Sequence, residues 1–225
     1  MTRRPGHPSG SASALRSRGA WIGLAIMTVV ALAADLGSKS IAFATVADTP
    51  VKIVRAEVLD AVRPSDLLPD HDAVTAVPHV LEFTLVLNEG AVFGMAAGQR
   101  FFFIGFTIVA IGFCLWMFAS WTGARDRWAH AAIALVVAGG VGNLYDRLVY
   151  ACVRDFLHFL PGVKLPFGLA WPGGDRELWP YVSNVADAEL IIGIALLMWF
   201  SLRAPADAAE ETPETKPTDD AGSDA

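Results

Sequence analysis

Four aspartates lie where an apolar segment meets a polar one, and these are the residues most able to do chemistry. They are Asp35, Asp146, Asp155 and Asp187. Two carboxyl groups held together in a poorly solvated site cannot both ionise at low cost, so one keeps its proton. The ionised group can deprotonate a water that attacks an amide carbonyl, while the protonated group can donate to the carbonyl oxygen and then to the leaving amine. This is aspartic peptidase chemistry, and spacing alone does not select two of the four.

The sequence lacks the motifs of other hydrolases and of metal or phosphate sites. The five histidines have no metal-ligand spacing, and HExxH, GxSxG and Walker patterns do not occur. Cys114 and Cys152 match no metal or redox spacing and are interpreted as small unpaired hydrophobic residues. We therefore expect no metal and no cofactor. No basic stripe interleaved with aromatic residues occurs, which argues against a nucleic-acid partner.

The composition indicates a membrane protein. Hydrophobic residues make up 54% of the chain and charged residues only 18%, whereas soluble domains are about 25% charged. Four apolar segments approach the roughly 20 residues that a helix needs to cross the bilayer. Their expected bounds are residues 21–44, 101–121, 128–145 and 184–202. Residues 81–87 are expected to form a strand that ends in a turn at residues 88–90. The predicted fold class is an all-α membrane protein with four transmembrane helices.

Basic residues near the span ends predict the topology. They precede the first span, separate the second from the third and follow the fourth, at Arg16, Arg18, Arg125, Arg127 and Arg203. Both termini are then cytoplasmic, and the segments 45–100 and 148–181 lie outside. Residues 1–19 are expected to be a disordered leader, with a cleavable signal peptide as the alternative. The membrane domain is expected over residues 20–203, followed by a disordered acidic tail at 204–225.

Polar residues concentrate at the predicted outer ends of the spans. They include Asp35 and Lys39 one helical turn apart, and they continue with Asn88, Asn143, Asp146, Arg147, Asn184, Asp187 and Glu189. Such residues could also be structural ion pairs or, for Asn184, a helix cap. An ion-coupled carrier with Asp35, Lys39 and Asp187 as a relay remains an alternative, although it predicts polar residues throughout the bilayer depth. A membrane scaffold whose outer sheet binds a partner is a third interpretation.

Three segments and one short motif resemble the signature blocks of bacterial lipoprotein signal peptidase (signal peptidase II, aspartic peptidase family A8). The segments are NEGAVFG at residues 88–94, GGVGNLYDRL from residue 139 continuing into VRDFLHF at 153–159, and SNVAD at 183–187; DLGSK at 35–39 is similar to the family's DxxSK. The resemblance covers about residues 20–203. It implies a four-helix membrane peptidase with a small extracytoplasmic β-sheet, the β-cradle, which cleaves prolipoproteins N-terminal to a diacylglyceryl-modified cysteine.

The resemblance also implies roles for individual residues. Asp155 and Asp187 match the catalytic positions. The supporting and substrate-binding positions fall on Asp35, Lys39, Asn88, Gly90, Asn143, Asp146, Arg147 and Asn184. The implied partners are the diacylglyceryl-modified prolipoprotein and membrane lipid, for a monomer in the inner membrane with its site at the periplasmic face.

The chain also departs from the family pattern. Val153-Arg154-Asp155-Phe156 stands where the family usually has Val-Val-Asp-Phe, and Ser183 replaces a phenylalanine. Arg154, next to Asp155, could favour the ionised form of that aspartate. Insertions near residues 48–80 and 160–180 could reshape the substrate entrance or bind a partner.

Overall fold

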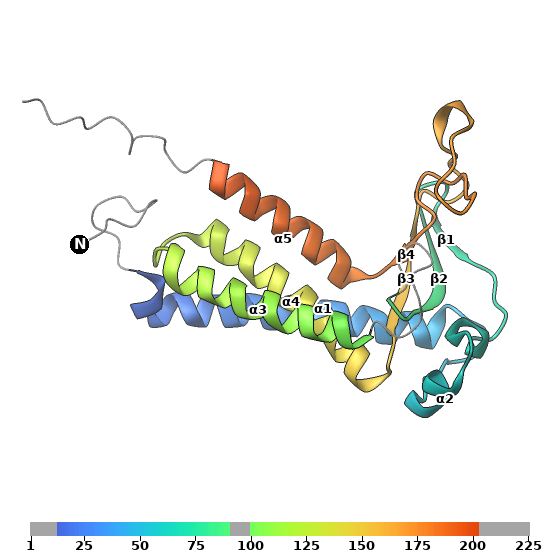
Figure 1. Cartoon of the computed structure of the whole chain (residues 1–225), viewed down its shortest axis with the longest axis horizontal. Helices are drawn as coiled ribbons and strands as arrows, with labels where there is room; N and C mark the ends of the chain where they lie inside the picture. The colour runs from blue at the N-terminus through green and yellow to red at the C-terminus, as the bar shows by residue number, and fades with distance from the viewer. Residues whose placement is uncertain (1–12, 91–99, 203–225) are drawn as a thin grey trace, which may run out of the picture.

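Four long helices form the body of the molecule, and each is long and apolar enough to cross a membrane. The computed structural model describes residues 13–90 and 100–202. Within these ranges the long helices are α1 (Arg18–Thr45), α3 (Arg100–Trp121), α4 (Arg127–Val149) and α5 (Val185–Leu202). Figure 1 shows them running along one another, with a small β-sheet at one end. The fold class predicted from the sequence is confirmed.

Two helix ends differ from the predicted spans in a way that affects the polar residues. Helix α4 continues to Val149 rather than ending near residue 145, so Asp146 and Arg147 lie within its last turns. Helix α5 begins at Val185 and Asn184 precedes it. The Asn184 side-chain oxygen accepts a hydrogen bond from the backbone N–H of Asp187, as an N-cap residue does. Both ends therefore hold polar side chains in fixed positions.

Helix α4 is central, because it packs against α1, α3 and α5. Glycines allow the closest of these approaches. A Cβ atom at Gly139 would overlap with the backbone oxygen of Ala186 on α5, and one at Gly193 would lie 2.8 Å from the backbone oxygen of Ala132 on α4. Small residues let helix backbones come this close in a membrane, where packing rather than exclusion of water drives association. The contact places the start of α5 against the middle of α4.

The expectation that residues 1–19 form a disordered leader is wrong for the part that the structure describes. Residues 13–17 contain a short 3-10 helix, η1 (Ala14–Arg16), whose first turn is capped by Ser13. Ala14 is fully buried, and its N–H donates a 3.0 Å hydrogen bond to the backbone oxygen of Thr122 after α3. Its side chain belongs to a buried apolar cluster with Leu24 of α1 and Phe118 of α3, so the segment is attached to both helices. Residues 1–12 and the predicted tail at 204–225 lie outside the described residues.

A four-stranded antiparallel sheet lies at one end of the bundle (Figure 1). Its strands are β1 (Val74–Val77), β2 (Leu81–Asn88), β3 (Val153–Phe159) and β4 (Val182–Ser183), in that order. Leu85, Leu87 and Phe156 bury their side chains against Ala42 and Phe43 at the end of α1. The register pairs Val86 with Asp155 and Asn88 with Val153. Because side chains alternate along a strand, Val86, Asn88 and Asp155 lie on the opposite face from Leu87.

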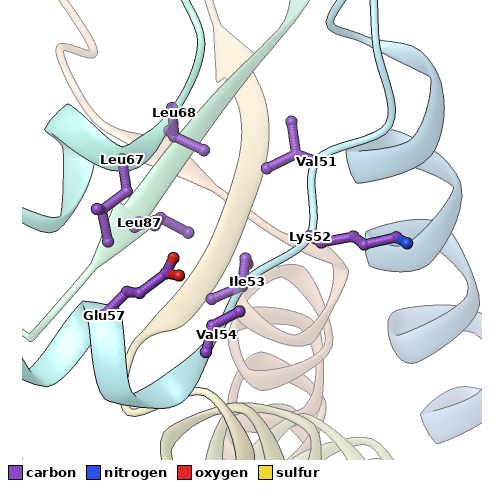
Figure 2. Close-up of a pocket in the computed structure, with 8 residues that line it drawn as sticks. All are labelled: Val51, Lys52, Ile53, Val54, Glu57, Leu67, Leu68 and Leu87. Carbon is purple, nitrogen blue, oxygen red and sulfur yellow. The ribbon is translucent and has the colours of Figure 1, made fainter.

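The inserted segment 48–80 folds back onto β2. It contains α2 (Arg55–Asp60), η2 (Pro64–Leu67) and β1. Figure 2 shows Leu67 and Leu68 meeting Leu87 across a crevice, which has a volume of only about 20 Å³. The ring of His71 adds a polar anchor: its Nε2 accepts a 2.9 Å hydrogen bond from the backbone N–H of Leu85. The segment is therefore packed tightly against the sheet.

The second inserted segment, residues 160–180, forms a long loop with a short 3-10 helix, η3 (Pro166–Gly168). Two backbone hydrogen bonds tie its arms together, from Leu178 to Val163 at 2.7 Å and from Leu165 to Arg176 at 2.8 Å. His158 of β3 lies between two acids: its Nδ1 is 2.8 Å from Glu82 of β2, and its Nε2 is 3.2 Å from Glu177 of the loop. These contacts attach the loop to the sheet.

Candidate active site

Asp155 is the third residue of β3 and is almost completely buried, with 1% of its surface exposed. Two amide groups donate hydrogen bonds to its carboxyl oxygens. Asn88 Nδ2, at the end of β2, lies 2.9 Å from Oδ2, and Asn184 Nδ2 lies 2.6 Å from Oδ1. The sheet register brings Asn88 to this position, because Asn88 is two residues beyond the partner of Asp155 on the same face. Asp155 is therefore held from both sides.

Asp187 lies in the first turn of α5, where the backbone dipole favours a negative charge. Its Oδ1 accepts a 2.8 Å hydrogen bond from Asn143 Nδ2 on α4. Its Oδ2 accepts a 3.1 Å hydrogen bond from the backbone N–H of Asn184. Asp187 is only partly buried, so it is the more solvent-accessible of the two aspartates.

Asn184 joins the two aspartates. Its side-chain nitrogen donates to Asp155, its backbone nitrogen donates to Asp187, and its side-chain oxygen accepts from the N–H of Asp187. Residues from β3 and from α5 thus meet around one asparagine at the end of the bundle that carries the sheet. This arrangement suits a pair of carboxyl groups that act on one bond.

Burial, and after it the nearby charge of Asp187, raise the pKa of the Asp155 carboxyl group to about 7. The two asparagine donors act in the opposite direction, because they stabilise the ionised form. Near neutral pH Asp155 can therefore hold or release a proton, which is the property that general acid–base catalysis needs.

Lys39 is the centre of a buried ionic network beneath the aspartates. Its side chain is fully buried, and its Nζ lies 2.9 Å from Asp35 Oδ2, 3.0 Å from Asn143 Oδ1 and 3.4 Å from Asp146 Oδ2. Asp35 Oδ1 also accepts a 2.9 Å hydrogen bond from the N–H of Ala186 on α5. The network ties α1, α4 and α5 together. Buried charges persist only when they are paired in this way.

Gly142 makes room for this network. A Cβ atom at this position of α4 would overlap with the Asp35 carboxylate. The glycine-rich run at residues 139–142 thus serves close helix packing, as expected of glycines within a membrane span.

Gly90 and Arg147 meet at the ring of Phe103. Gly90 adopts a φ of +91°, its N–H donates a 2.8 Å hydrogen bond to Asn88 Oδ1, and a Cβ there would lie 2.7 Å from the Phe103 ring. The Arg147 guanidinium lies 5.1 Å from the centre of the same ring and donates to the backbone oxygen of Asn143 at 3.3 Å. The sequence analysis did not single out Phe103, because an aromatic residue in an apolar span is unremarkable.

Arg154 does not act on Asp155 as the sequence suggested. Successive side chains on β3 point to opposite faces, so Arg154 turns away from its neighbour. Its guanidinium instead pairs with Asp146 at 2.8 Å and lies 4.5 Å from the centre of the Tyr150 ring. The sequence analysis therefore missed the partner of Arg154. The available signal was that the residues two positions away on the same face, Cys152 and Phe156, are apolar, so a charged residue between them needs a buried partner.

The ten residues expected at the site fall into connected groups. Asn88, Asn143 and Asn184 contact the two aspartates directly, while Asp35, Lys39 and Asp146 form the ionic network behind them. Gly90 and Arg147 contact the asparagines Asn88 and Asn143. Glu189, which had no predicted role, is buried on α5, and its Oε2 has no hydrogen-bond partner within the part of the chain that the structure describes.

The two cysteines stand apart from this chemistry. Cys152 is completely buried between α4 and β3, and burial raises the pKa of its thiol to about 12. A thiol with such a pKa is not nucleophilic near neutral pH. Cys114 is likewise buried and unpaired. Their environments agree with the interpretation as small hydrophobic residues.

Comparison with known proteins identifies the family. Residues 27–203 match the family model described as signal peptidase (SPase) II. A protein named lipoprotein signal peptidase from Azoarcus sp. (strain BH72) is 35% identical over 146 residues, which cover 63% of this chain and 73% of that protein. A protein of the same name from Halothermothrix orenii is 30% identical over 149 residues, covering 66% of this chain and 85% of the relative.

A solved structure has the same fold. It is described as a bacterial membrane enzyme determined by the in meso method at 2.3 Å, and it aligns with a TM-score of 0.58 at 24% identity over 84% of this chain and 92% of its own. The relatives and the four apolar helices together indicate a multi-pass bacterial membrane protein. The chain belongs to the signal peptidase II family, whose members remove signal peptides from prolipoproteins.

Proposed function

We propose that this chain is an intramembrane aspartyl endopeptidase that cleaves prolipoproteins N-terminal to a diacylglyceryl-modified cysteine, with Asp155 and Asp187 as its catalytic residues. The observation that carries the proposal is the position of Asn184, which donates hydrogen bonds to both carboxyl groups. Two acids linked in this way, one of them almost fully buried, are suited to share a proton.

In the proposed reaction Asp155 is the acid and Asp187 is the base. Asp187 is the more accessible carboxylate, and it takes a proton from a water that attacks the scissile carbonyl carbon. Asp155, whose pKa is raised to about 7 by burial and by the charge of Asp187, donates a proton to the carbonyl oxygen. When the C–N bond breaks, the leaving amine is protonated from the dyad. The products are the signal peptide and a lipoprotein that begins with the modified cysteine.

The supporting residues keep this geometry. Asn143 presents its Nδ2 to Asp187 because its oxygen accepts hydrogen bonds from Lys39 and Asn184. Asn88 and Asn184 hold Asp155 from opposite sides. Such preorganised donors lower the reorganisation needed in the transition state.

The substrate is proposed to bind with its signal helix between the spans and its lipid tails among the outer-leaflet acyl chains. Binding energy from the helix and the lipid then positions an ordinary peptide bond beside the dyad. The chain is proposed to act as a monomer in the inner membrane. One chain supplies both aspartates and the three asparagines that donate to them, so a monomer is sufficient for the proposed dyad.

Two conservative variants test the mechanism. Asp155→Asn and Asp187→Asn each keep the size of the side chain but cannot exchange a proton, so cleavage of a lipidated precursor should fall by at least about 1,000-fold. Asp60→Asn is the matched control, because Asp60 is exposed on α2, away from the dyad. Normal turnover by either dyad variant would remove that residue from the mechanism. Ion flux in proteoliposomes without cleavage would favour the carrier instead.

Labelling tests the proposed topology. Phe167 on the outer loop is 98% exposed and Arg125 in the α3–α4 connection is also exposed, while both native cysteines are buried. A membrane-impermeant maleimide applied to spheroplasts should label Phe167→Cys and spare Arg125→Cys. The reverse pattern would place the dyad on the cytoplasmic side.

A further inference from the structure

A groove with a volume of about 400 Å³ opens on the outer sheet and reaches Asp155. Its floor is formed by Val86 and Asn88 of β2 and by Asp155 of β3, which share one face of the sheet. Its two sides come from the inserted segments: Arg63 and Ser65 belong to the first, and Tyr181 follows the second. The insertions therefore shape a surface that is continuous with the dyad.

The side of the groove that carries Arg63 is held in place. Arg63 immediately precedes η2, whose Leu67 packs on Leu87 through the narrow crevice in Figure 2. His71 fixes the far end of the same stretch by accepting from the backbone N–H of Leu85, while its Nδ1 donates to the backbone oxygen of Pro69 at 2.9 Å. These contacts fix the backbone on this side of the groove, so the Arg63 side chain starts from a defined position.

The groove carries separated charges. Arg63 is exposed and makes no ion pair within residues 13–90 and 100–202, whereas Glu89 lines the part of the groove near Asp155. A ligand that reaches from the dyad to Arg63 is therefore favoured if it presents a negative group at the Arg63 end. A positive group there is disfavoured by repulsion.

The proposed reaction determines which part of the substrate can lie in this groove, and the inference rests on that reaction. The chain on the N-terminal side of the scissile bond is the apolar signal helix, which belongs among the spans. The chain on the other side must leave the bundle at the end that carries the sheet. A polypeptide leaving Asp155 over the face of β2 and β3 meets the groove and then Arg63.

We propose that the groove binds the extended polypeptide that follows the modified cysteine, and that Arg63 selects substrates with an acidic side chain in this stretch. The insertion at residues 48–80 is then a specificity element rather than a passive addition. Arg63 is a specificity-determining residue and takes no part in bond cleavage.

Lipidated precursors that differ at one residue test this assignment. Asp, Asn or Lys is placed in turn at each of the first six or so positions after the modified cysteine, and kcat/KM is measured with the full chain. At one or two adjacent positions Asp should be cleaved about five-fold faster than Asn, and Lys slower, since an exposed ion pair supports changes of this order. Arg63→Glu should invert the ranking, and 0.5 M salt should weaken it.

Lys52→Glu is the matched control, because Lys52 is exposed on the same segment but outside the groove, and the change in net charge is identical. It should leave the ranking unchanged. The inference fails if Arg63→Glu keeps the wild-type ranking, or if it lowers the turnover of all precursors equally. Binding of the same peptides to Asp187→Asn protein gives the ranking without turnover, so loss of cleavage in the dyad variants and loss of selection by Arg63 are separate results.

Discussion

The Lys39 ammonium group on α1 donates a 3.0 Å hydrogen bond to the side-chain oxygen of Asn143 on α4, in the interior of the bundle. Asn184 Nδ2 donates to the same oxygen at 3.2 Å, and the two donors together fix which way the Asn143 amide faces. With its oxygen engaged by Lys39 and Asn184, the amide presents its nitrogen to Asp187 at 2.8 Å. A buried cation thus orients a neutral side chain, which in turn holds a proposed catalytic carboxylate.

Replacing Lys39 with methionine should destabilise the protein. Asp35 and Asp146 would both lose the buried cation that they share, and breaking a buried ion pair costs about 3–5 kcal/mol. Unfolding in detergent, followed by circular dichroism as SDS is added, should show the loss. Lys52→Met is the control on an exposed lysine and should be neutral. Equal stability of the two variants would contradict a stabilising role for the ionic network around Lys39.

Asn184→Ala should impair catalysis more than folding. The variant removes the side-chain donor to Asp155 but keeps the backbone N–H that reaches Asp187. Loss of one preorganised donor lowers kcat by about 100-fold in comparable sites, and loss of the cap on α5 costs about 1 kcal/mol. Steady-state cleavage together with unfolding separates the two effects. A variant with normal kcat would show that the bridge between the aspartates is not needed.

The pH dependence of cleavage should reflect Asp155. Its pKa is raised to about 7, mainly by burial and then by the charge of Asp187, so the protonated form prevails below pH 7. The kcat/KM should therefore fall about tenfold per pH unit above that value. Asn88→Ala removes a donor that stabilises the ionised form, so its midpoint should move to higher pH. An unchanged profile from pH 6 to 9 would argue against Asp155 as the acid.

The same group should affect stability with a definite sign. Because the pKa of Asp155 in the folded protein lies above the value of 3.8 for an unperturbed aspartate, the folded state binds more protons between these values. Its contribution to stability is fully present below pH 3.8 and is lost as the pH rises through about 7. In detergent, Asp155→Asn should remove this component of the pH dependence, and Asp60→Asn should not.

Two glycines on α4 provide a matched pair. A methyl group at Gly142 would overlap with the Asp35 carboxylate, whereas one at Gly140 would lie 3.5 Å from Ile111, an ordinary contact. Gly142→Ala should displace Asp35 from Lys39 and lower the free energy of unfolding by about 2 kcal/mol or more. The rate of cleavage should fall as well. Gly140→Ala should fold and cleave normally. Equal behaviour of the two would show that α1 and α4 can move apart at little cost.

Local chemistry was enough to predict the outline of the protein from its sequence. The length and apolarity of four segments predicted the spans, because burial in a bilayer depends on about 20 consecutive residues and not on distant partners. The run at residues 81–87 was correctly assigned to a strand, which extends to Asn88. The order of the polar blocks indicated the family that the comparisons confirm.

Pairing between distant residues could be decided only by the tertiary structure. Sequence spacing could not show which two of the four aspartates form a dyad. In the structure Asp155 and Asp187 share hydrogen bonds with Asn184, whereas Asp35 and Asp146 pair with Lys39. The sequence suggested that Arg154 acts on the adjacent Asp155, but side chains alternate along β3 and Arg154 pairs with Asp146 instead. Charge interactions depend on separation in space and on burial. Both are set by how helices and strands pack, which a linear pattern does not contain.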